Sequence, residues 1–208
     1  MAGPKIVYYF TLISPWAYLG HGLLLEMAAR HGAELDYRPI GLGQIFSHTG
    51  GLPLAQRAPA RQAYRMLELQ RWREKRGVPL NLKPKFFPFD VSLADRAMTV
   101  LLTAGDAAAE AFAQATFAAV WAQDRNMADA AEIAAVLVAS GAPAEAVLAQ
   151  AASPETKARY QLNIDEALAS GVFGSPCYLL NGELFFGQDR LELLGEALAS
   201  GREAYLPA

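Results

Sequence analysis

The amino end of the chain alternates between β-prone and helical patterns. Residues 5–10 form an almost unbroken apolar run, typical of a strand covered on both faces, and residues 34–40 form a second β-prone run. The segment between them, 15–31, carries apolar residues at four-residue spacing: Leu19, Leu23 and Met27. A helix joining two strands predicts a βαβ unit with a parallel strand pair and a right-handed crossover.

Residues that favour helix ends mark the boundaries of two helices. Ser14 is a favourable N-cap, Pro15 suits the first helical position, and Gly32 supplies a stop. A second Ser-Pro pair, Ser153-Pro154, begins a helix that we expect to end at Gly171.

The middle of the chain has a purely helical pattern and is rich in alanine. The predicted helices cover residues 59–76, 92–104, 106–123, 129–139 and 143–151. Ser92, Asp106 and Asp129 stand at positions where N-caps are expected. We interpret the charged run around Trp72 as a solvated helix face, with the Trp72 ring packed inward.

Near the carboxyl end the β pattern returns. Residues 177–180 and 183–186 are predicted strands, joined by Asn181-Gly182, a dipeptide typical of tight hairpins. Asp189 can cap a final helix. Each end of the chain supplies only two strands, too few for an independent sheet, so the two ends must pair with each other.

This order of elements predicts an α/β fold, a thioredoxin-like domain interrupted by an insertion. The thioredoxin-like domain would comprise residues 1–41 and 153–208, and the inserted all-helical domain would comprise residues 42–152.

Composition excludes several classes of function. Of the 208 residues, 53% are hydrophobic and 19% are charged, and the net charge of −3 argues against a nucleic-acid partner. No stretch approaches the ~20 apolar residues of a membrane span, so we expect a soluble, cytoplasmic protein.

The single cysteine, Cys177, excludes an internal disulfide or a CxxC pair, and we expect a buried, inert thiol. The three histidines lack the spacing of metal ligands, so no metal site is expected.

Three segments could carry chemistry in such a fold. Ser14 occupies an N-cap, where helical N–H groups favour an anion, and the absence of cysteines at Ser14 and Ala17 rules out disulfide exchange by this chain alone. Ser175-Pro176 stands where the fold places a cis-proline that faces this turn and exposes the backbone of Ser175. The turn at 186–190 could bind both ends of an amino acid.

Each of these segments also has a plainer interpretation. Ser14-Pro15 could be only a helix start, Pro176 an ordinary loop proline, and Asp189 a simple cap.

Four motifs occur in one order along about residues 5–200: Tyr8-Tyr9-Phe10 with Ser14-Pro15, Leu69-Gln70-Arg71-Trp72 with Gly77-Val78-Pro79, Gly171-Val172-Phe173-Gly174-Ser175-Pro176, and Phe186-Gly187-Gln188-Asp189-Arg190-Leu191. Together they resemble the 2-hydroxychromene-2-carboxylate isomerase family, a relative of kappa-class glutathione transferases and DsbA. The resemblance implies a glutathione-dependent isomerase of aromatic catabolism, which interconverts this compound and trans-o-hydroxybenzylidenepyruvate. It also implies a homodimer.

In that family's reaction the glutathione thiolate adds to the unsaturated substrate and leaves again. The resemblance implies that Ser14 hydrogen-bonds the sulfur and favours the thiolate over the thiol. The positions that match glutathione-binding residues are Ser175, Pro176, Phe186, Gly187, Gln188 and Asp189.

The resemblance also implies a set of substrate contacts. Gln56 and Arg57 match an Asn-Arg pair near the substrate carboxylate, which Arg57 could hold bidentately. Phe46 and Phe86 stand where a lysine and a tyrosine are expected, which suggests a less polar or differently oriented ligand. Two alternatives stay open: a kappa-like glutathione transferase and a non-catalytic DsbA-like binding protein.

Overall fold

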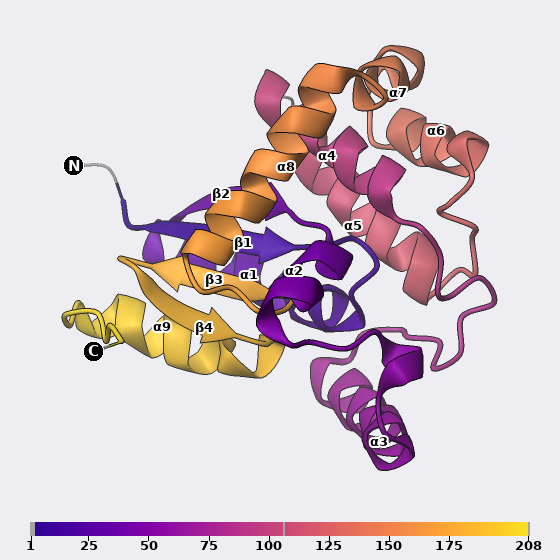
Figure 1. The fold of residues 1–208 in the computed structure, drawn as a ribbon. Helices are drawn as coiled ribbons and strands as arrows, with labels where there is room; N and C mark the ends of the chain where they lie inside the picture. The colour runs from indigo at the N-terminus through magenta and orange to yellow at the C-terminus, as the bar shows by residue number, and fades with distance from the viewer. Residues whose placement is uncertain (1–2, 106, 208) are drawn as a thin grey trace.

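The structure is a computed structural model that describes residues 3–105 and 107–207. A four-stranded mixed sheet in the order β2-β1-β3-β4 lies at its centre (Figure 1). β1 (Lys5–Phe10) pairs parallel with β2 (Glu34–Pro39) and antiparallel with β3 (Cys177–Leu180), which pairs antiparallel with β4 (Glu183–Phe186). The two ends of the chain therefore share one sheet, as predicted.

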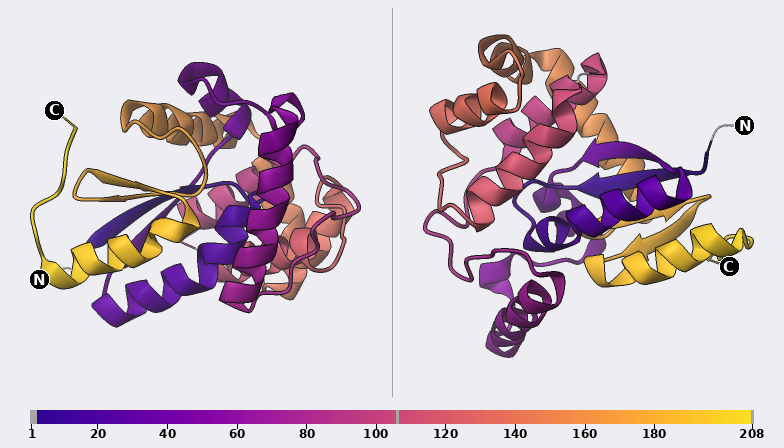
Figure 2. Two further views of the ribbon diagram at one scale, coloured as in Figure 1. Left: turned by 90° about the horizontal axis from the view of Figure 1, so that it is seen from below. Right: turned by 180° about the vertical axis from the view of Figure 1, so that it is seen from behind.

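Helices cover both faces of this sheet. α1 (Pro15–His31) and α9 (Leu191–Ser200) lie on one face, and α8 (Pro154–Ala169) lies on the other, as the view from below in Figure 2 shows. Alternate residues of β1 point to opposite faces, so Tyr8 joins the main core beside α1, while Tyr9 joins a smaller core beside α8.

The remaining helices lie between β2 and β3 in the sequence: α2 (Leu42–Thr49), α3 (Pro59–Arg76), α4 (Ser92–Ala104), α5 (Ala108–Trp121), α6 (Ala130–Ala139) and α7 (Ala144–Ala151). Five of these helices were predicted. α2 and a short 3-10 turn, η1 (Leu54–Gln56), were not predicted, because both are brief and bounded by glycine or proline. None of the described helices is long and apolar enough to cross a membrane.

Three of the predicted N-caps are confirmed. Ser14 accepts a hydrogen bond from the Ala17 N–H at 3.2 Å, Ser153 from the Thr156 N–H at 3.2 Å, and Asp129 from the Ala131 N–H at 2.8 Å. Each bond satisfies a backbone donor at a helix start that has no partner within the helix.

Two predicted caps are wrong. Ser92 is the first residue of α4, and its N–H donates to the Asp90 carboxylate at 2.9 Å, so Asp90 satisfies this helix start. The Asp189 carboxylate accepts from Arg190 at 2.7 Å and does not cap α9, which begins after a 3-10 turn, η2 (Gln188–Arg190). Asp106 lies outside the described residues.

Candidate functional site

Ser14 ends a tight turn between β1 and α1. Its N–H donates to the Thr11 carbonyl at 3.0 Å, and the residue is 4% exposed. The hydroxyl donates to the Ser175 carbonyl at 3.3 Å, a long bond that a stronger acceptor can replace. Ser14 thus stands at the positive end of α1 with a hydroxyl proton available to an anion.

The Ser175-Pro176 peptide is cis, as predicted, and faces the Ser14 turn. The Ser175 hydroxyl oxygen accepts from the Thr11 N–H at 3.2 Å, so both the backbone and the side chain of Ser175 are bonded to the turn. A Cβ at the preceding Gly174 would lie 2.6 Å from the Phe186 ring. Glycine at this position lets the Phe186 ring pack directly against the loop, and a larger residue would displace the ring.

The turn after β4 is held by α3. Gly187 has a φ of 97°, a left-handed conformation that favours glycine. Gln188 is 2% exposed; its side-chain oxygen accepts from Arg76 Nε at 2.9 Å, and its carbonyl accepts from Arg76 Nη2 at 3.1 Å. Arg76, at the end of α3, therefore fixes the turn that presents the half-buried Asp189 carboxylate.

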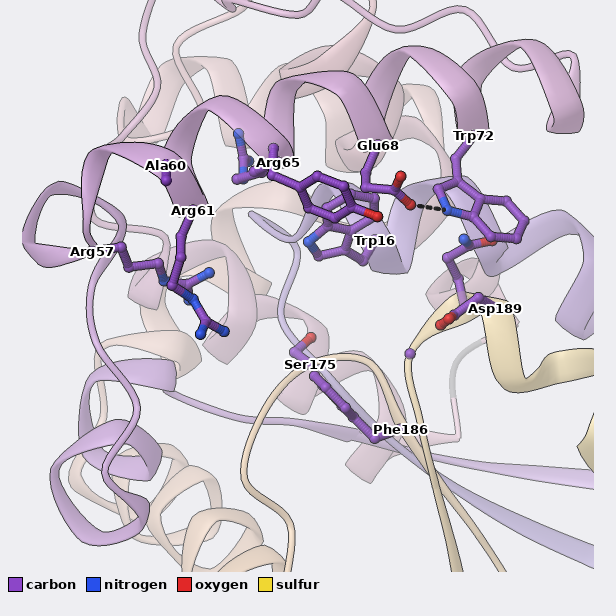
Figure 3. Close-up of a pocket in the computed structure, with 13 residues that line it drawn as sticks. Trp16, Arg57, Ala60, Arg61, Arg65, Glu68, Trp72, Ser175, Phe186 and Asp189 are labelled. Atoms are coloured by element: carbon purple, nitrogen blue, oxygen red, sulfur yellow. Dashed lines mark hydrogen bonds between the residues drawn. The ribbon is translucent and has the colours of Figure 1, made fainter.

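Two adjoining pockets open beside these segments. The first, the α3–β4 pocket, has a volume of about 570 Å³ (Figure 3), and the second, the Ser14 pocket, has a volume of about 680 Å³. Both volumes are typical of small-molecule sites. The residues shared by the two linings are Trp16, Arg57, Arg61, Arg65, Ser175 and Phe186.

Three arginines spaced four residues apart border both pockets: Arg57, just before α3, and Arg61 and Arg65, in the first two turns of α3. None of them forms an ion pair with an acidic side chain in the part of the chain that the structure describes. Arg57 lies over the Phe46 ring, and Arg65 lies over the Phe87 ring. Burial, with a smaller contribution from Arg57, lowers the pKa of Arg65 to about 10. These unpaired cations make the pockets favourable to an anionic ligand.

The structure brings most of the predicted site residues together. Ser14 and Phe46 line the Ser14 pocket; Gly187, Gln188 and Asp189 line the α3–β4 pocket; Arg57, Ser175 and Phe186 line both. Three predicted site residues do not line either pocket in the described structure: Pro176, Gln56 and Phe86. The neighbouring Phe87, rather than Phe86, lines the Ser14 pocket.

Sequence reasoning missed a row of pocket residues on α3. Arg61, Arg65, Glu68 and Trp72 follow one another at spacings of four, three and four residues, which places them on one face of the helix. Figure 3 shows these side chains on the wall opposite Ser175 and Phe186. The Trp72 ring packs against the main core, as predicted, but it also lines the pocket and donates from Nε1 to Glu68 at 3.1 Å. The helical period of this row was the available signal.

Cys177 is buried at the start of β3, and burial raises the pKa of its thiol to about 12. Because the thiolate is the reactive form, we expect no alkylation of the folded protein by iodoacetamide near pH 8 and modification of this single cysteine after unfolding in urea. Mass spectrometry of the two samples measures the difference. Rapid alkylation of the folded protein would contradict the burial of this thiol.

No group of three or more histidine, cysteine, aspartate or glutamate residues in the described ranges could hold a metal ion. His21 is buried between aromatic rings, and burial lowers its pKa to about 4, so its imidazole is neutral at physiological pH.

Known proteins share this architecture over nearly the whole chain. The model of the DSBA-like thioredoxin domain matches residues 5–199. A 2-hydroxychromene-2-carboxylate isomerase of Sphingobium xenophagum is 30% identical over 190 residues, covering 91% of this chain and 95% of the relative. Glutathione S-transferase kappa 1 of Rattus norvegicus is 23% identical, with 91% and 88% covered. A solved structure of 2-hydroxychromene-2-carboxylate isomerase superimposes with a TM-score of 0.79 at 25% identity, covering 94% of this chain and 95% of that one. The chain belongs to the family of DSBA-like thioredoxin domains.

Proposed function

We propose that this protein is a glutathione-dependent isomerase that acts on 2-hydroxychromene-2-carboxylate or a closely related aromatic carboxylate, in the catabolism of aromatic compounds. One observation carries the proposal: the Ser14 hydroxyl, at the N-terminus of α1 and against the Ser175 carbonyl, borders a pocket rimmed by unpaired arginines. The similarity to isomerases of this compound and to kappa-class glutathione transferases supports the same assignment.

The groups around the α3–β4 pocket fit the chemistry of glutathione, which has a thiol, an ammonium group and two carboxylates. The Asp189 carboxylate can accept from the ammonium group, and the backbone of Ser175 can pair with the cysteinyl peptide. Ser14 can donate to the sulfur, and the N-terminus of α1 favours the negatively charged form. When bound, glutathione would supply the thiolate that adds to the unsaturated substrate.

The arginines and aromatic rings form the substrate half of the proposed site. Arg57 can hold a carboxylate bidentately, and Arg61 and Arg65 add positive charge to the same rim. Phe46 and Phe87 supply apolar surface for an aromatic ring. Gln56 is exposed on η1 and Phe86 is half-buried beside Lys85, and they remain predicted contacts only.

The test is to incubate the protein with glutathione and 2-hydroxychromene-2-carboxylate. We expect conversion to trans-o-hydroxybenzylidenepyruvate with no net loss of glutathione. Accumulation of a glutathione adduct would instead indicate a kappa-like transferase. If calorimetry detects no glutathione binding, the enzyme assignment is wrong and a non-catalytic binding protein remains.

The Asp189→Ala substitution should weaken glutathione binding about tenfold or more, because it removes one hydrogen bond to a charged group. Isothermal titration calorimetry measures the dissociation constant. Glu192→Ala is the matched control, since Glu192 is an exposed acid at the start of α9 that pairs with Lys75 and does not line either pocket. Equal affinities of the two variants would remove Asp189 from the proposed site.

A further inference from the structure

Asp95, on α4, is fully buried without a cation to balance it. Its carboxylate accepts from the Leu12 N–H at 2.9 Å, from the Thr11 hydroxyl at 2.7 Å and from the Tyr160 hydroxyl at 3.1 Å. No ion pair joins it to any lysine or arginine of the described residues. A carboxyl group in such a place is costly, because its charged form loses hydration that no opposite charge replaces.

The hydrogen bonds of Asp95 converge on the Ser14 turn. Thr11 and Leu12 are the first two residues of this turn, which closes where the Ser14 N–H meets the Thr11 carbonyl. Thr11 also donates its N–H to the Ser175 hydroxyl, so a single residue connects Asp95 to both sides of the proposed sulfur site. The one side chain of α4 for which a hydrogen bond to Asp95 is recorded among the described residues is that of Thr99, whose hydroxyl donates to the Asp95 backbone carbonyl at 2.9 Å.

We propose that Asp95 is a positioning residue that holds the Ser14 turn through Thr11 and Leu12, and whose negative charge makes the sulfur bound at Ser14 a more reactive nucleophile. The proposal rests on glutathione binding with its sulfur at Ser14.

The charge of Asp95 acts on the bound sulfur through space. Two negative charges in one poorly hydrated region repel each other, so ionised Asp95 raises the pKa of the bound thiol. This effect opposes the N-terminus of α1, which lowers the same pKa. For charges ~10 Å apart at an effective dielectric constant of ~20, the effect is about one pH unit. A thiolate of higher pKa is the stronger nucleophile.

Burial and the groups around Asp95 together bring its pKa close to neutral pH. Burial raises the pKa of Asp95 to about 7, and the hydrogen bonds from Leu12, Thr11 and Tyr160 oppose this rise. Tyr160 faces the carboxyl group from α8, and Asp90 adds a like charge from the segment before α4. The neighbouring Arg96 donates from Nε to the Ala151 carbonyl on α7.

Asp95→Asn removes the charge and keeps the shape. The amide oxygen can accept from the Leu12 N–H, and the amide NH2 group can donate to the hydroxyl oxygens of Thr11 and Tyr160. Thr99→Val is the matched control, because Thr99 lies one turn away on the same helix and is also buried. Among the described residues, no recorded hydrogen bond joins the Thr99 side chain to the Ser14 turn.

The experiment titrates the thiolate of protein-bound glutathione by its ultraviolet absorbance. We expect the midpoint in Asp95→Asn to lie about one pH unit below that of the wild type, and kcat above that midpoint to fall about threefold. We also expect the melting temperature of Asp95→Asn to rise at alkaline pH, because no buried charge remains. Thr99→Val should keep the wild-type midpoint and melt at a lower temperature.

A wild-type midpoint that Asp95→Asn leaves unchanged would overturn the role of Asp95 while leaving glutathione binding intact. A raised midpoint together with a lowered melting temperature would show a purely structural residue and would also overturn it. If the wild type shows no thiolate signal with saturating glutathione, the proposed function fails and this inference fails with it.

Discussion

We expect the Ser14→Ala variant to lose about tenfold in kcat near neutral pH, because losing a hydrogen bond to the thiolate raises the thiol pKa by about two units, and the smaller thiolate fraction outweighs the gain in nucleophilicity. The sulfur would lose the hydroxyl donor and keep only the N-terminus of α1, so the pKa of the bound thiol should rise. Steady-state kinetics and an absorbance titration of the bound thiolate measure both effects. Full activity with an unchanged thiol pKa would contradict the role of Ser14.

Ser153→Ala is a closely matched control for this substitution. Ser14 and Ser153 both cap a helix that begins with proline, and both accept an N–H bond at 3.2 Å. Each variant should lose about 1 kcal/mol of unfolding free energy with its cap. Only Ser14→Ala should lose activity, so the comparison separates the chemistry of the hydroxyl from its contribution to the helix.

The unfolding free energies of the wild type and Asp95→Asn should diverge as pH rises. The folded-state pKa of Asp95, about 7, lies above its ordinary value of 3.8, so the contribution of Asp95 to the unfolding free energy is most favourable below pH 3.8, where its carboxyl is neutral in both states. This contribution is lost as pH rises to about 7. A rise of roughly 3 pH units corresponds to about 4 kcal/mol, which the uncharged variant retains.

Urea denaturation at several pH values between 4 and 8 measures this difference directly. Other groups also titrate: Arg38, for example, helps lower the pKa of Asp36, and Arg202 that of Glu183, so the pH dependence of the wild type alone is not decisive. The difference between the two proteins cancels these contributions. Parallel curves at all pH values would mean that Asp95 is not titrating in the folded state.

Local signals in the sequence were sufficient for the sheet and for the Ser14 turn. The Ser-Pro helix start and the Asn181-Gly182 hairpin each depend on a few adjacent residues, and the structure has the corresponding elements at the predicted positions. α2 was missed because an eight-residue helix between glycines carries too short a period. Asp189 was assigned to a cap because its position fits one, whereas its neighbour Arg190 takes its carboxylate.

The contacts that assemble the site could not be predicted in the same way. Arg76 reaches Gln188 across 112 positions, and Asp95 reaches Thr11 across 84, and no local pattern records either pair. A buried aspartate in a helix is indistinguishable in the sequence from an exposed one. The row of pocket residues on α3 was different. Its helical period was visible in the sequence, and only its orientation toward the pocket could not be predicted.

The two walls of the paired pockets come from parts of the chain that can vary separately. Ser14, Ser175 and Asp189 belong to the sheet and its connections. The opposite wall, with Arg61 and Arg65, belongs to α3, which lies between β2 and β3 in the sequence. A relative could therefore exchange the recognition of one ligand by remodelling α3 while inheriting the sulfur chemistry unchanged. Arg76 sets the limit of such an exchange, since a transplanted α3 without it would release the turn that carries Asp189.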